Sequence, residues 1–221
     1  MGPRTAQIGA IGFAIGVTFG AGEGKAAELA GAGRFHAGKD LGPLAVVVVV
    51  DDRAKVSPAV LDDAETEAAR IYRQAGLKTT WRTVPTLVEG TPSENRRPPT
   101  PAFTVQLIIQ PEFLGQPPRA SEFLMGAAPP TMNECGGSVY VFFDQVAGAS
   151  NVQRMEPYRV LGAVMAHEIG HRLLRHDGHS SEGLMHAPWN ATDWAKASLG
   201  LLLFTPSERE AIRATASSCG R

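Results

Sequence analysis

The stretch PYRVLGAVMAHEIGHRLLR, residues 157–175, carries the strongest structural signal in this sequence. Pro157 suits the first turn of a helix, where a missing N–H costs no hydrogen bond. The following positions are apolar on nearly every side until Arg172, so we expect a buried helix. Asp177 and Gly178 form a turn signal just beyond it and are expected to turn the chain out of the helix.

Within this helix, the sequence HEIGH gives the pattern H-E-x-x-H. His167 and His171, at positions i and i+4, project about 40° apart on one helix face, so both can bind one metal ion. Glu168 lies about 60° round from His171, which is too displaced for a ligand but near enough to reach a water molecule on that ion. We expect Glu168 to be the general base. Neutral nitrogen ligands at this spacing favour Zn²⁺ with one coordination position open.

Histidine is clustered around this motif, because five of the six histidines fall within residues 167–186. His176 stands at i+5 from His171 and would point off the metal-facing side, so it is interpreted as a helix-end histidine that interacts with the dipole. His186 is not expected to be a ligand either. The apolar surroundings argue against a chance motif, since two unliganded imidazoles and a carboxylate would be costly there.

The rest of the chain predicts an α/β (α+β) fold with a mixed sheet. Residues 44–50 (LAVVVVV) are typical of a central strand buried on both faces, and a helix is expected from Pro58 to Gly76. Further strands are predicted at residues 77–84, 103–109, 122–127 and 138–143, with Pro-rich surface loops at 85–101 and 116–120. The chain should close with a helix over residues 206–217, capped by Thr205.

Composition excludes several classes of protein. The 221 residues include 21 Lys and Arg against 22 Asp and Glu, a formal net charge of -1, which argues against nucleic acid as the main partner. With 43% hydrophobic and 19% charged residues the chain is not disordered throughout, and its length suits one domain or a domain with an appendage. The 24 Gly and 16 Pro indicate a loop-rich fold, not a plain helical bundle.

The N-terminal region has the order of a secretory signal peptide: Arg4, then the uncharged residues 8–20, then small residues up to 27. We therefore predict export to the periplasm or medium, with a signal peptide at 1–27, a flexible Gly-rich lead-in at 28–43 and a catalytic domain at 44–221. The alternative is a Gly-rich N-terminus on a cytosolic protein. No stable membrane span is expected, because the uncharged stretch is short and rich in glycine.

Two cysteines, Cys135 and Cys219, are too few for a disulfide scaffold and too far apart for a CxxC site. Together with the export signal they predict one disulfide, which would tie the last helix to the loop before the strand at Gly136. Two free thiols are the alternative.

The stretch HEIGHRLLRHDGHSSEGLMHAPW, residues 167–189, resembles the active-site segment of metzincin zinc peptidases, especially the matrixin-like branch. GGSVYVFFD, residues 136–144, is similar to the strand before the active-site helix in those enzymes. The chain also resembles small exported bacterial proteins with an HEIGH, SHS and GIM pattern and a closing LLFTP, as at residues 202–206. The likeness covers residues 44–217, and only 167–185 is specific.

This resemblance implies a zinc endopeptidase with a twisted mixed sheet, a long active-site helix and a small C-terminal helical part. A peptide or protein substrate would lie antiparallel along the edge strand at residues 122–127. Met185 would be the Met-turn methionine, which lies beneath the metal without binding it; the alternative is an ordinary core methionine.

The third ligand is chosen between His179 and Asp177. Asp177 stands at the family's spacing, six residues after His171, and a carboxylate is an acceptable zinc ligand. His179 is favoured because imidazole is the commoner ligand and because Leu174 stands where the family has a helix-ending glycine, so the chain should return later. The SHS-type relatives also carry their histidine there.

Two other functions are kept open. One is a gluzincin-like peptidase in which Glu208 or Glu210 is a distant third ligand. The other is a zinc-stabilised binding module without turnover. Glu168 argues against the second, because a purely structural site needs no base.

Overall fold

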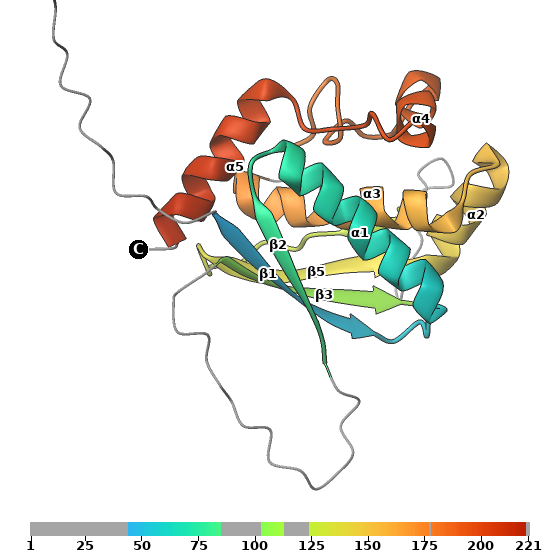
Figure 1. Cartoon of the computed structure of the whole chain (residues 1–221), viewed down its shortest axis with the longest axis horizontal. Coiled ribbons are helices and arrows are strands. Elements are labelled where there is room, and N and C mark those ends of the chain that lie inside the picture. The colour runs from blue at the N-terminus through green and yellow to red at the C-terminus, as the bar shows by residue number, and fades with distance from the viewer. Residues whose placement is uncertain (1–43, 85–102, 113–123, 177, 220–221) are drawn as a thin grey trace, which may run out of the picture. The chain divides into compact units, whose positions relative to one another are not determined.

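The computed structural model describes residues 44–84, 103–112, 124–176 and 178–219 (Figure 1). The predicted signal peptide and lead-in, both Pro-rich loops and Asp177 lie outside the described residues. Within the part that is described, no helix has the length and apolar character that a membrane crossing requires.

The centre of the fold is a five-stranded sheet, as the sequence predicted. The strands are β1 (Ala45–Asp52), β2 (Lys78–Thr83), β3 (Phe103–Gln110), β4 (Gly126–Ala127) and β5 (Gly136–Phe142). They are arranged in the order β2-β1-β3-β5-β4, and only the β4–β5 pair is antiparallel. The valine run of β1 lies between two parallel neighbours, where β-branched side chains pack well.

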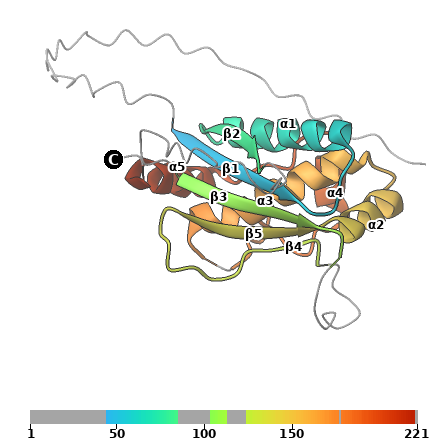
Figure 2. The same ribbon diagram turned by 90° about the horizontal axis from the view of Figure 1, so that it is seen from below.

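Five helices complete the described part of the chain: α1 (Pro58–Gln74), α2 (Phe143–Gln153), α3 (Pro157–Leu174), α4 (Ala191–Ser198) and α5 (Pro206–Cys219). The two long helices α1 and α3 lie on the same side of the sheet in Figure 1. Seen from below in Figure 2, strands β1, β3 and β5 lie in front of α3. The fold is therefore mixed α/β with its core between the sheet and these helices.

Helix α3 is held in place by close packing against α1. A Cβ at Gly162 would lie 2.6 Å from the Ala64 carbonyl oxygen, so glycine is required for the two backbones to approach this closely. The Tyr72 hydroxyl donates a hydrogen bond of 2.8 Å to the carbonyl of Ala166. Every residue of α3 from Val160 to Leu173 is buried, which confirms the predicted buried helix.

Several boundaries differ from the predictions. The edge strand expected at residues 122–127 is reduced to Gly126–Ala127, and the described residues before it are not in a strand. Helix α3 ends at Leu174, one residue before the predicted end, and Arg175 turns the chain with a left-handed backbone ahead of the turn signal at Asp177 and Gly178.

Helices α2 and α4 were not predicted. In α2 there is no strong amphipathic pattern, and it follows β5 without a break. Helix α4 does carry a local signal: the Asn190 side chain caps it, and Asp193 completes a capping box. The structure also joins Cys135 and Cys219, the pair named from the sequence, in a disulfide.

Candidate metal centre

Helix α3 presents His167 and His171 one turn apart, both buried, with exposed fractions of 7% and 8%. Their Nε2 atoms lie 3.2 Å apart. For two nitrogens bound tetrahedrally to one zinc ion at 2.0–2.1 Å, the expected separation is about 3.3 Å. The two rings are thus spaced as a pair of ligands to one ion.

The hydrogen bonds of the two Nδ1 atoms determine which ring nitrogens carry a lone pair. The Nδ1 of His167 lies 2.8 Å from the Leu184 carbonyl oxygen, and that of His171 lies 3.2 Å from the His176 carbonyl oxygen. A carbonyl can only accept, so each Nδ1 carries the proton and each Nε2 carries a lone pair. Two lone pairs facing each other at 3.2 Å repel unless a cation lies between them. This donor arrangement fits a metal ion.

His179 joins the two helical histidines from the loop after α3. Its ring centroid lies 5.3 Å from that of His167 and 5.1 Å from that of His171, and the three ligand atoms fall within 4.8 Å of one another. Unlike its partners, His179 is exposed. The three side chains could hold a metal ion, and the described residues contain no other such group of three.

Burial keeps these imidazoles neutral. Desolvation lowers the pKa of His167 to about 3, with smaller lowering effects from the neighbouring histidines. Desolvation also lowers the pKa of His171 and of His179. Because a metal binds the neutral imidazole, all three groups are in the correct protonation state near neutral pH.

Glu168 is buried beside the cluster and lies against the edge strand. A Cβ built on Gly126 would stand 2.5 Å from Glu168 Oε1, so the carboxylate occupies the space that a side chain on β4 would take. Burial raises the pKa of Glu168 to about 8, and the charge of Arg172 opposes this rise. Sequence reasoning missed Gly126, because nothing in MGAA shows that the glycine meets a carboxylate from another element.

Met185 is fully buried under the same helix. A Cβ at Gly170 would lie 2.8 Å from the Met185 sulfur and 2.9 Å from the Phe204 ring, so the sulfur contacts α3 next to His171. The preceding residue, Leu184, accepts the His167 Nδ1–H through its carbonyl and donates its own N–H to Leu203. The segment around Met185 therefore packs against α3 and orients the His167 ring.

The other two histidines of the described residues stand outside the cluster. The His176 side chain is exposed, and its carbonyl contributes through His171. His186 donates from Nδ1 to Asp193 at 2.5 Å, a contact that no spacing in the sequence indicated.

The two glutamates considered as distant ligands are not brought to the cluster. Glu208 accepts a hydrogen bond from the Ser180 hydroxyl with one carboxylate oxygen. Its other oxygen accepts the Thr205 N–H at 2.7 Å, and the Thr205 hydroxyl accepts the Glu208 N–H, as expected for an N-cap. Glu210 is exposed on α5. Of the described candidates for a third ligand, His179 alone joins the pair, and Asp177 is outside the described residues.

No model of a known protein family matches this chain, and no curated protein matches it either. The function of the chain is therefore inferred from the geometry of the site.

Proposed function

We propose that this chain is an exported, zinc-dependent endopeptidase of metzincin-like, matrixin-like type. The observation that carries the proposal is the combination on α3: two buried imidazoles whose lone pairs converge at 3.2 Å, next to a buried glutamate that lies against an edge strand. The disulfide supports export, because such bonds persist in oxidising compartments.

Zinc is the metal that suits this set of ligands. Three neutral nitrogen donors are typical of catalytic zinc sites, in which the fourth position stays open. Zinc bound there supplies a Lewis acid and lowers the pKa of a coordinated water toward 7. The set His167, His171 and His179 is proposed as the ligand set.

Glu168 is proposed to move the proton. The carboxylate takes a proton from the attacking water and then passes it to the leaving amine of the cleaved peptide bond. Burial alone favours the protonated acid, since its pKa is raised to about 8. A metal ion held by the three neutral imidazoles would place positive charge near Glu168, which would favour the carboxylate and prepare it as a base.

The edge of the sheet is proposed to hold the substrate. Among the described residues, strand β4 pairs only with β5, so its other side can pair with an extended peptide through main-chain hydrogen bonds. Because Gly126 has no side chain, the Glu168 carboxylate lies directly beside this strand. A peptide paired antiparallel to β4 would therefore pass close to the proposed base.

The test is a metal analysis combined with a peptide-library digest of the full chain. We expect one zinc per chain and cleavage that stops on chelation and returns when Zn²⁺ is added. A protein that holds zinc tightly but cleaves no peptide would be a zinc-stabilised binding module. A protein that binds no zinc would refute both functions.

A further inference from the structure

The end of helix α3 has an unusual residue for its conformation. Arg175 caps the helix with a left-handed backbone, φ 57°, and its N–H donates to the His171 carbonyl at 3.0 Å. This position normally favours glycine, so an arginine there needs support from its surroundings.

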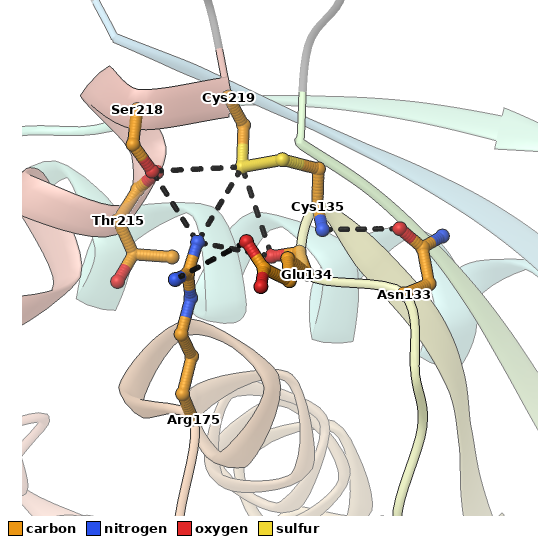
Figure 3. Close-up of polar contacts among 7 residues, drawn as sticks. All are labelled: Asn133, Glu134, Cys135, Arg175, Thr215, Ser218 and Cys219. Atoms are coloured by element: carbon orange, nitrogen blue, oxygen red, sulfur yellow. Dashed lines mark hydrogen bonds and ion pairs between the residues drawn. A yellow bond between two sulfur atoms is a disulfide. The ribbon is translucent and has the colours of Figure 1, made fainter.

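The support comes from the arginine side chain, which reaches two distant segments (Figure 3). Its Nη2 donates to the Glu134 carbonyl at 3.2 Å and to the Ser218 hydroxyl at 3.3 Å, and lies 4.0 Å from the Cys219 sulfur. Its Nη1 lies 3.9 Å from a carboxylate oxygen of Glu134. One guanidinium thus bridges the segment before β5 and the last turn of α5.

A covalent bond joins the same two segments. The Cys135–Cys219 disulfide links residues 84 positions apart in sequence, and each cysteine is adjacent to a partner of Arg175. The side chain of Asn133 further fixes this loop by accepting the Cys135 N–H at 3.0 Å. The disulfide therefore holds Glu134 and Ser218 together as one docking surface for the guanidinium.

The connection to the metal centre is the backbone on either side of Arg175. The next residue, His176, offers the carbonyl that accepts the Nδ1–H of His171 at 3.2 Å. The chain then continues to His179 within three residues. The position of Arg175 thus sets both the acceptor that orients one ligand and the starting point of the loop that carries another.

We propose that Arg175, held by the Cys135–Cys219 disulfide, is a positioning residue for the metal centre. Its guanidinium fixes the turn after α3 so that His171 keeps its ring orientation and His179 returns to the site. This inference rests on the metal centre of the proposed function and adds a distant anchor to it.

A matched control is available on α5. Arg213 also donates to a backbone carbonyl, that of Ala75 at the end of α1, at 3.2 Å. Replacing Arg213 by alanine removes a comparable hydrogen bond, so it reports what such a loss does to stability alone.

The decisive variant is Arg175→Gly. Glycine adopts the left-handed conformation easily, so the helix end is retained while the guanidinium is lost. In the full chain, with Zn²⁺ affinity measured by competition with a chelator, we expect about tenfold weaker binding, as for other groups that orient metal ligands. The absorption spectrum of the Co²⁺-substituted protein should also change. Arg213→Ala should leave both unchanged.

The double variant Cys135→Ser/Cys219→Ser should weaken Zn²⁺ binding in the same way. Combining it with Arg175→Gly should add little, because the three side chains act as one unit. Unchanged Zn²⁺ affinity and an unchanged Co²⁺ spectrum in Arg175→Gly would overturn the inference. A wild-type protein that binds no Zn²⁺ overturns the metal centre as well, whereas one that binds Zn²⁺ without cleaving peptides contradicts only the peptidase proposal.

Discussion

The histidine cluster of the candidate metal centre is built from two regions that differ in how they are held. His167 and His171 stand on a buried helix, with both outer nitrogens bonded to carbonyl oxygens. His179 stands on an exposed loop. A ligand on a packed helix is oriented before any metal arrives, whereas a ligand on a loop depends on what anchors that loop. The helical side should therefore dominate catalysis and the loop side should be the more easily perturbed.

The largest effect is expected on the helical side, from Glu168→Gln. This change removes the proposed base but keeps the size and both ligands, so peptidase activity should fall by several orders of magnitude while zinc content and fold remain. Activity on a cleaved library peptide and bound zinc are the two measurements.

Glu67→Gln is the control for this change, because Glu67 is also a buried glutamate but forms an ion pair with Arg70 on α1. It should keep most of the activity. Loss of zinc in Glu168→Gln would make Glu168 a ligand and contradict the mechanism.

Next come the ligands themselves. Removing a metal ligand should cost far more zinc affinity than removing a turn residue. We therefore expect His167→Ala and His179→Ala each to lose zinc, and Asp177→Ala to keep it, with bound metal measured after dialysis. If Asp177→Ala empties the site while His179→Ala leaves it full, the loop ligand is the aspartate.

The same contrast explains what could be predicted from the sequence. The helix positions repeat with a fixed period, so the spacing of His167 and His171 was enough to place both proposed ligands and the proposed base on one helix. The sheet followed from runs of β-branched residues such as the one in β1. The fold class and the helical half of the site could therefore be predicted from the sequence.

The loop half of the site, which carries His179, could not be predicted in the same way. The sequence left Asp177 and His179 as alternatives, because the path of a loop depends on distant contacts such as those of Arg175 with Glu134 and Ser218. The close approach of Gly126 to Glu168 is likewise a contact between separate elements. Local patterns contain no information about which backbone a side chain will meet.

Gly126→Ala tests the contact between Gly126 and Glu168, and its effect on peptidase activity should be intermediate. The new methyl group would stand 2.5 Å from Glu168 Oε1, so the carboxylate must shift while the three histidines stay in place. A misplaced catalytic group can cost about a hundredfold in rate, and we expect a loss of that order with zinc retained. Gly148→Ala is the control, because nothing lies within 4 Å of a Cβ there. Equal activity in both variants would show that Glu168 does not need this position.

The smallest effect concerns the stability of the metal-free protein in acid. Burial lowers the pKa of His167 from 6.5 to about 3, so the unfolded chain binds more protons between these values, and stability should fall as the pH drops below about 6.5. The pKa of His179 is also lowered, but this ring is far less buried and should contribute less. Urea unfolding of chelator-treated protein at pH 7 and pH 5 measures this loss of stability.

The comparison is made between variants at His167 and His179. Glu168 has a raised pKa, so its titration stabilises the folded protein as the pH falls, but Glu168 is present in all the variants compared. We expect His167→Gln to remove more of the acid loss than His179→Gln, and an equal change in both would contradict the distinction between a ligand held by the helix and one held by the loop.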